Sequence, residues 1–316
     1  MNCPKNKVIV DNLIRAWSII NKEKYKKILC TISGGADSDI VLDICTKVDV
    51  HNKIEYVWFD TGLEYQATKN HLKYLSEKYS IDIKSYKSKK PIPWTCKNKG
   101  YPFLNKRTSN YIQRLQKHNF KFEDKSFDEL YKEYPRCKSA LRWWCNCYES
   151  NSLNIRNNKW LKEFLIKNPP NFQISDMCCQ YTKKDVLHRI LKEENYDLNI
   201  SGIRKLEGGL RATAYKGCFD EKLDECDNYR PIFWYSDKDK YDYELHYGIK
   251  HSECYIGYGL KRTGCAGCPF GRNFEGELEA IKKYEPKLYK AVNNIFDKSY
   301  EYTRKYREFV NEMNKK

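Results

Sequence analysis

A glycine-rich hexapeptide is the first feature of this sequence with recognisable chemistry. Ser33-Gly34-Gly35-Ala36-Asp37-Ser38 follows a short apolar run and precedes a segment with helical spacing. The glycines lack Cβ atoms where a turn must approach a ligand closely. Backbone N–H groups at a helix N-terminus, with the Ser33 and Ser38 hydroxyls, can bind an anion. The pattern predicts a phosphate-binding loop, although it is not a Walker loop. The alternative is an ordinary strand–helix turn with a serine cap.

Four cysteines form a second pattern, one with metal-binding chemistry. Cys178 and Cys179 are adjacent, and the turn Cys265-Ala266-Gly267-Cys268 follows about 85 residues later. Glycines in such a turn free backbone amides to donate hydrogen bonds to thiolates. Adjacent cysteines are an awkward chelate for tetrahedral zinc, whereas neighbouring thiolates can reach different irons of a cubane. The pattern favours a [4Fe-4S] cluster, and zinc or plain buried thiols are the alternatives.

Two further segments carry polar groups that suit a phosphorylated ligand. Arg204 and Arg211 lie in a Gly-containing run, and guanidinium groups bind tetrahedral oxyanions through two parallel hydrogen bonds. Asp60 and Gly62 follow an apolar run at Phe59-Asp60-Thr61-Gly62. The alternatives are a solvated basic loop for the arginines and a helix cap for Asp60.

The elements that must position these residues alternate along the N-terminal third. Helical spacing covers Lys7–Lys22, Asp37–Thr46 and Leu63–Tyr79, and apolar strand-like runs cover Ile28–Ile32, Ile54–Phe59 and Ile81–Tyr86. Repeated strand, turn and helix predict a parallel sheet with right-handed crossovers. The carboxyl ends of such strands form the ligand crevice, where the loop and Asp60 both fall.

The rest of the chain is less regular. Between residues 87 and 171 the pattern is basic and aromatic, with helical patches at Thr108–Gln116 and Trp160–Lys167. A strand-like run, Leu198–Ile203, restores the alternation, and helices are expected over Asp237–Tyr247 and from Glu275 onward. We therefore expect residues 1–86 and 172–274 to form an α/β nucleotide-binding core. Residues 87–171 are expected to be an insertion and 275–316 a C-terminal helical extension.

In combination, these motifs resemble the phosphoadenylyl-sulfate (PAPS) reductase family of the adenine-nucleotide α-hydrolase, or N-type ATP pyrophosphatase, superfamily. SGGxDS is similar to the superfamily's pyrophosphate loop, and Asp60-Thr61-Gly62 to the reductase DTG element. Gly202–Arg211 resembles the run whose arginines hold the sulfate or phosphate end of the nucleotide. The cysteines resemble the [4Fe-4S] ligand set of adenylyl-sulfate reductases, in which Lys183 occupies a matching position beside the cluster. The resemblance implies a doubly wound, mostly parallel sheet.

One family feature is missing. Sulfonucleotide reductases carry a nucleophilic cysteine near the C-terminus, and no cysteine follows Cys268 here. The expectation is that another thiol, Cys145 or Cys147, takes its place or that the scaffold performs different sulfur chemistry. The alternative for these two cysteines is packing within an aromatic insertion.

Composition limits the classes of partner. Fourteen cysteines among 316 residues are too few for a disulfide scaffold, and no apolar run is long enough to span a membrane. Met1–Val10 has no signal-peptide pattern, so a cytoplasmic location is expected. The formal net charge of +16 favours a polyanionic partner, or reflects a Lys-rich coding bias.

The resemblance therefore predicts an enzyme that binds an adenine nucleotide, which is ATP with Mg²⁺, PAPS or adenylyl sulfate, and performs sulfur chemistry with its cluster. The nucleotide would contact Ser33, Gly34, Gly35, Asp37, Ser38, Asp60, Gly62, Arg204 and Arg211, and the cluster would be bound by Cys178, Cys179, Cys265 and Cys268. A first alternative is ATP-dependent thiolation of tRNA or DNA. A second is a non-catalytic nucleotide- or nucleic-acid-binding module of a mobile element. The sequence does not predict the sulfur acceptor, the electron donor or the oligomeric state.

Overall fold

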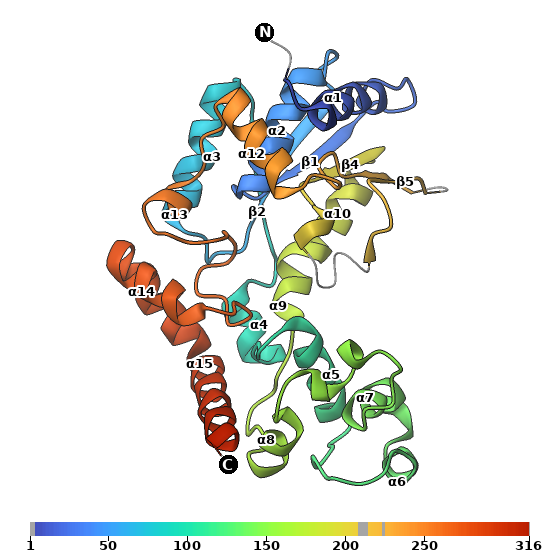
Figure 1. Ribbon diagram of the computed structural model, residues 1–316, viewed down its shortest axis with the longest axis vertical. Helices are drawn as coiled ribbons and strands as arrows, with labels where there is room; N and C mark the ends of the chain where they lie inside the picture. The colour runs from blue at the N-terminus through green and yellow to red at the C-terminus, as the bar shows by residue number, and fades with distance from the viewer. Residues whose placement is uncertain (1–3, 208–213, 223–224, 316) are drawn as a thin grey trace. The chain divides into compact units, whose positions relative to one another are not determined.

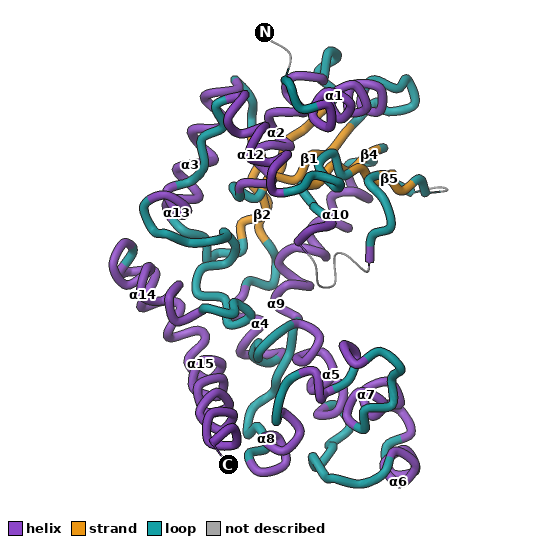
Figure 2. The backbone as a smooth tube through the Cα atoms, viewed as in Figure 1, coloured by secondary structure: helices purple, strands orange, loops and turns teal. Residues whose placement is uncertain are grey.

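The structure, a computed structural model, describes residues 4–207, 214–222 and 225–315 and divides into two compact units. Met1–Ser88 and Thr182–Ala266 form the first, which we call the sheet unit. Lys89–Tyr181 and Gly267–Lys316 form the second, which we call the helical unit. Figures 1 and 2 show that all strands belong to the sheet unit.

The sheet unit contains one six-stranded sheet in the order β3-β2-β1-β4-β6-β5. Its strands are β1 (Ile28–Ile32), β2 (Ile54–Asp60), β3 (Ile83–Lys87), β4 (Leu198–Ser201), β5 (Phe219–Asp220) and β6 (Asp227–Tyr229). Every neighbouring pair is parallel except β5 with β6, and Ile28 in the centre pairs with Ile54 on one side and Leu198 on the other. The predicted α/β fold with a mostly parallel sheet is confirmed.

Helices cover both faces of this sheet, because alternate residues of each buried strand point to opposite sides. Ile28 and Cys30 of β1 contribute to the large apolar core under the helices α1 (Lys7–Ile20) and α2 (Ala36–Val48). Leu29 lies on the other face with Ile190. The other α-helices among the described residues of this unit are α3 (Gln66–Tyr79), α10 (Asp185–Glu193), α12 (Asp237–Tyr247) and α13 (Glu253–Ile256). The sheet is therefore doubly wound, as the resemblance implies.

The helical unit is built from short helices around an aromatic core. Its α-helices are α4 (Ile92–Lys99), α5 (Lys106–Gln116), α6 (Phe127–Glu133), α7 (Lys138–Trp144), α8 (Leu161–Lys167), α9 (Met177–Cys179), α14 (Phe274–Tyr284) and α15 (Pro286–Lys315). Three-residue 3₁₀ turns occur at Pro135–Cys137, Asn151–Leu153 and Ile155–Asn157. A π-helical turn, Gln180–Lys184, follows α9. Within the described residues, no helix is both long enough and apolar enough to cross a membrane.

The C-terminal helix α15 shares this aromatic core with the segment that begins after β3. Tyr302 and Tyr306 of α15 are buried against Phe164 of α8, with ring centroids 5.1 and 5.3 Å from it. Their hydroxyls donate hydrogen bonds to the carbonyls of Asn168 and Lys159, both at 2.6 Å. Segments far apart in sequence thus bury one another's apolar surface.

Candidate functional site

The predicted phosphate loop lies between β1 and α2, at the carboxyl end of the central strand. Gly34 has φ +68°, a left-handed conformation that favours glycine, and a Cβ there would come within 2.8 Å of the Thr68 side chain. The Ser33 hydroxyl accepts a hydrogen bond from the Gly35 N–H (3.3 Å), and the Ser38 hydroxyl accepts one from the Ser33 N–H (3.0 Å). The loop is held in shape by its own serines.

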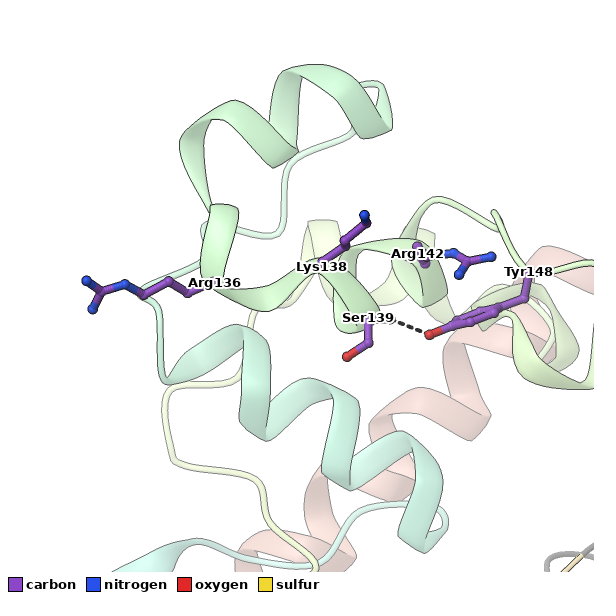
Figure 3. A pocket seen from close by; sticks show the side chains of 5 residues that line it. All are labelled: Arg136, Lys138, Ser139, Arg142 and Tyr148. Carbon is purple, nitrogen blue, oxygen red and sulfur yellow. Dashed lines mark hydrogen bonds between the residues drawn. The ribbon is translucent and has the colours of Figure 1, made fainter.

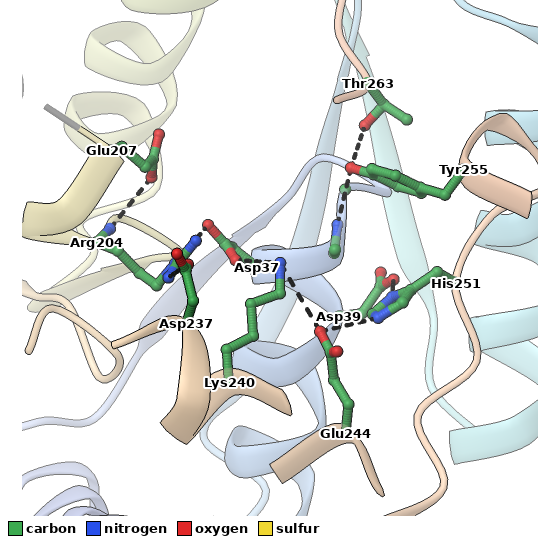
Figure 4. Close-up of polar contacts among 12 residues, drawn as sticks. Asp37, Asp39, Arg204, Glu207, Asp237, Lys240, Glu244, His251, Tyr255 and Thr263 are labelled. Atoms are coloured by element: carbon green, nitrogen blue, oxygen red, sulfur yellow. Dashed lines mark hydrogen bonds and ion pairs between the residues drawn. The ribbon is translucent and has the colours of Figure 1, made fainter. Parts of the chain in front are cut away.

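A second segment of the sheet unit covers the loop amides. The Tyr255 hydroxyl, from α13, accepts a hydrogen bond from the Ala36 N–H at 3.1 Å and lies 3.5 Å from the Thr263 hydroxyl (Figure 4). A Cβ on Gly35 would meet the Thr263 oxygen at 3.0 Å and the Tyr255 oxygen at 3.3 Å. Hydroxyl oxygens therefore occupy acceptor positions at the amides of Gly35 and Ala36. Neither Tyr255 nor Thr263 was predicted from the sequence.

The acidic residue of the loop is neutralised by two cations. The Asp37 carboxylate is 3.1 Å from the Arg204 Nε and 2.8 Å from the Lys240 Nζ (Figure 4). Arg204 also contacts Asp237 at 2.8 Å, and its backbone N–H donates a hydrogen bond to Glu207. Arg204, predicted at the nucleotide, is thus beside the loop and directed at its carboxylate.

A buried charge cluster lies two residues further along α2. Asp39, only 1% exposed, is 3.0 Å from the His71 Nε2 and 2.8 Å from the His251 Nδ1. The His251 Nε2 lies 3.0 Å from the Glu244 carboxylate. Burial opposes protonation of His251, but the hydrogen bonds to the two carboxylates outweigh it and raise its pKa to about 9. The imidazolium therefore ties α2 to α12 and to the residues before α13.

The carboxyl end of β2 carries two further predicted nucleotide residues, Asp60 and Gly62. Asp60 accepts a hydrogen bond from the Gly62 N–H at 2.8 Å, and Gly62 has φ +84° with open space where a Cβ would be. Next to this turn, burial raises the pKa of the Glu64 carboxyl, and the ammonium of Lys183 acts in the opposite direction. Lys183, expected beside the cluster, thus acts to lower the pKa of Glu64, a residue that the sequence did not single out.

Three of the predicted cluster cysteines belong to the helical unit. The pKa of Cys178 is raised well above its ordinary value, mainly by the thiol of Cys179 and by burial. The thiol of Cys268 contributes less in the same direction. Cys96, a further buried thiol nearby, has its pKa raised to about 12 by burial. Gly267 has φ +61°, and its carbonyl accepts a hydrogen bond from the Tyr300 hydroxyl, which fixes the turn before Cys268.

The fourth predicted ligand, Cys265, belongs to the sheet unit. The N–H of the following residue, Ala266, donates a hydrogen bond to the Leu63 carbonyl at 2.6 Å, beside the β2 turn. No group of three or more His, Cys, Asp or Glu side chains is arranged to hold a metal ion in the part of the chain that the structure describes.

The candidate nucleophiles Cys145 and Cys147 follow α7 in the helical unit. Burial raises the pKa of the Cys145 thiol to about 11, although the Lys162 ammonium acts in the opposite direction. Cys147 is exposed, and its thiol donates to the Cys145 carbonyl. Cys145 is therefore a thiol rather than a thiolate near neutral pH.

Arg211, the second arginine predicted at the nucleotide, lies outside the described residues.

Comparison with known proteins gives a family match to part of the chain, which includes residues of both units. Residues 27–136 match the phosphoadenosine phosphosulfate reductase domain family. Together with the doubly wound sheet, this match supports the adenine-nucleotide α-hydrolase superfamily. An uncharacterized protein of Methanocaldococcus jannaschii is 24% identical over 297 residues, which are 92% of this chain and 46% of that protein. The chain thus spans about half the length of the curated relative that it matches.

Three solved structures resemble the chain in fold alone. PAPS reductase from Candida auris is 12% identical with a TM-score of 0.42, covering 84% of this chain and 97% of that chain. The U34-tRNA thiolase NcsA from Methanococcus maripaludis, solved with its [4Fe-4S] cluster, is 13% identical with a TM-score of 0.42 (97% and 81% covered). The NH3-dependent NAD synthetase from Campylobacter jejuni is 12% identical with a TM-score of 0.39 (94% and 95% covered).

Proposed function

We propose that this chain is an enzyme that binds an adenine nucleotide through its Ser33–Ser38 loop and performs sulfur chemistry. The observation that carries the proposal is the loop itself. Its amides at Gly35 and Ala36 already donate to oxygen atoms, those of Ser33 and Tyr255, at 3.3 and 3.1 Å. Phosphate oxygens are stronger acceptors than hydroxyls at such donors, since they are charged. Nucleotide binding would exchange the Tyr255 oxygen for a phosphate oxygen.

The charges beside the loop support a polyphosphate ligand. An acidic first turn would repel phosphate, but Asp37 is matched by Arg204 and Lys240, and Asp39 by the imidazolium of His251. Neutralising both carboxylates leaves the helix N-terminus free to attract an anion, a contribution of about 0.3–1 kcal/mol. Asp60, at the end of β2, is the carboxylate that we assign to the ribose or to a nucleotide-bound Mg²⁺.

For the sulfur chemistry, we assign a [4Fe-4S] cluster to Cys178, Cys179, Cys268 and Cys265. The thiols of Cys179 and Cys268 raise the pKa of Cys178, and metal coordination would relieve this effect because it stabilises thiolates. When bound, a cluster would supply electrons or an iron site for a sulfur atom. A zinc ion at the same thiols is the alternative that metal analysis separates.

The nucleotide assignment is tested by calorimetry with ATP and with PAPS on the wild type and on Gly35→Val. The valine side chain would enter the space of Thr263, Tyr255 and the anion, so affinity should fall at least about tenfold, or about 1.4 kcal/mol. Gly217→Val, where an added Cβ has only contacts near 4 Å, is the matched control. Unchanged affinity in a folded Gly35→Val protein would sink the assignment. Formation of pyrophosphate from ATP, or of sulfite from PAPS, then identifies the reaction. If neither product forms, the chain is a non-catalytic binding module.

The cluster assignment is tested by anaerobic purification with iron, sulfide and zinc analysis. We expect about four irons and four sulfides per chain and loss of both in Cys178→Ser. Cys96→Ala, which removes a buried thiol in the same unit, should retain them. Protein with about one zinc, no sulfide and no charge-transfer absorbance would replace the cluster by a zinc site.

A further inference from the structure

The helical unit carries a surface hollow that the nucleotide proposal does not use. Its volume is about 340 Å³, and it is lined by Arg136, Lys138, Ser139, Arg142 and Tyr148 (Figure 3). Arg136 lies in the 3₁₀ turn Pro135–Cys137, and Lys138, Ser139 and Arg142 lie in α7. Three of the five lining side chains are cations and none is an acid, which is the composition of an anion site.

The floor of the hollow is held in place by contacts among its own residues. The Arg142 guanidinium is 4.5 Å from the centre of the Tyr148 ring and donates a hydrogen bond to the Cys147 carbonyl at 3.2 Å. The Tyr148 hydroxyl donates to the Ser139 carbonyl at 3.0 Å. Arg114 of α5 donates to the Ser139 hydroxyl at 2.9 Å. An arginine fixed in this way loses less side-chain entropy when it binds an anion.

The cations at this surface are not balanced by acids. Among residues that the structure describes, no ion pair with a carboxylate is formed by the four cations of this surface, Arg114, Arg136, Lys138 and Arg142. Neighbouring lysines do: Lys125 pairs with Glu123 and Glu133, and Lys162 pairs with Asp124 at 2.5 Å. The hollow therefore differs from the surface around Lys125 and Lys162, where carboxylates neutralise the cations.

The directions of the side chains distinguish between two kinds of anion. In Figure 3 the charged ends of Arg136, Lys138 and Arg142 point away from one another instead of converging on one point. A single phosphate group needs converging donors, whereas successive phosphates of a strand can each meet one cation. The aromatic faces are already used, since Arg142 covers Tyr148 and Tyr111 stacks on Trp143 at 5.2 Å. Stacking with bases therefore contributes little here.

We infer that this surface, made by Arg136, Lys138, Arg142 and the adjoining Arg114, binds the phosphodiester backbone of a nucleic-acid strand. The inference goes beyond the proposed function, which concerns the loop of the sheet unit. Because the proposed contacts are with phosphates, which every nucleotide carries, we expect binding to be independent of sequence and of the sugar. Each phosphate contact releases counterions, so affinity falls steeply with salt.

The test measures fluorescence anisotropy of a short labelled single strand of mixed sequence, made once as RNA and once as DNA, over a salt series. Arg136→Gln/Lys138→Gln/Arg142→Gln removes three charges from the hollow. Lys287→Gln/Lys290→Gln/Lys305→Gln removes three exposed charges from α15 of the same unit and is the matched control. The log–log salt slope should fall by about 2 in the hollow variant, at about 0.7 per phosphate contact, and affinity at least about tenfold. The control should stay within about twofold, and RNA and DNA should bind alike.

Several outcomes would overturn the inference. These are an equal loss in the hollow variant and the control, no loss in either, or a preference of about tenfold or more for one sugar. Displacement of the strand by inorganic phosphate at constant ionic strength would also overturn it, since it would indicate a site for one phosphate. If Arg142→Gln unfolds the unit, Arg136→Glu/Lys138→Glu, which alters only exposed side chains, answers the same question. ATP affinity, measured in parallel, should not change, so failure of the nucleotide proposal remains distinguishable.

Discussion

The guanidinium of Arg204 lies 3.1 Å from the carboxylate of Asp37, although the two residues are 167 positions apart in the sequence. This ion pair joins the segment after β4 to the first turn of α2. It is partly buried, with side-chain exposures of 11% and 18%, so solvent screens it less than it screens a surface pair. The pair holds the two predicted nucleotide-binding segments together before any ligand arrives.

A double-mutant cycle should therefore reveal strong coupling between these two residues. In urea unfolding of Arg204→Met, Asp37→Asn and the double variant, we expect a coupling free energy of about 1–3 kcal/mol. The exposed pair Lys238 and Asp242, 2.7 Å apart on α12, is the control and should give less than about 0.5 kcal/mol. Similar coupling in the two pairs would contradict the structural role that we assign to Arg204.

Stability should depend on the protonation of His251. Its pKa is raised from 6.5 to about 9 in the folded state, so its contribution is fully present below about pH 6.5 and is lost as pH rises toward 9. This pKa shift corresponds to a contribution of at most about 3 kcal/mol to the free energy of unfolding. Urea unfolding from pH 6 to 10 should show a wild-type decline that is absent in His251→Gln. Parallel pH profiles for the two proteins would exclude the charged imidazolium.

The Tyr255 hydroxyl should compete with the nucleotide. It accepts the hydrogen bond of the Ala36 N–H, which the proposed phosphate would take over. Removing this acceptor in Tyr255→Phe should raise ATP affinity by about two- to tenfold, the value of one net hydrogen bond. Tyr241→Phe, at a tyrosine that is 62% exposed, should have no effect. Weaker binding in Tyr255→Phe would instead make the hydroxyl part of the binding site.

The turn before Cys268 should tolerate no side chain at Gly267. A Cβ at this residue would lie 2.7 Å from the Tyr300 hydroxyl. The left-handed φ of +61° would lower the free energy of unfolding by a further amount of about 1–2 kcal/mol for any residue with a Cβ. Gly248 has the same φ with nothing within 4 Å, so Gly248→Ala isolates the conformational cost. We expect Gly267→Ala to lose more unfolding free energy than Gly248→Ala and to lower the iron content. An equal loss in both, with iron retained, would refute this role of the turn.

Local sequence was sufficient for strands β1 to β4 and for several helices of the sheet unit. Apolar runs and helical spacing predicted Ile28–Ile32 and Asp237–Tyr247 with the bounds that the structure has, because burial of one face fixes the period of apolar residues. The glycines at 34 and 35 indicated the loop, since a tight turn beside Thr68 and Thr263 leaves no room for a Cβ. Two strands, β5 and β6, were missed, because two or three residues are too few to show alternation.

What only the tertiary structure decided is which distant groups meet. No local period places Tyr255 at the Ala36 N–H, Arg204 at Asp37, or Tyr302 of α15 in the core of the helical unit. These contacts join residues more than a hundred positions apart, and packing selects them from many alternatives of equal local propensity. The sequence determined which chemical groups this protein has and which secondary structure holds them. Their partners, burial and charge states depend on long-range packing, because each is set by neighbours from other parts of the chain.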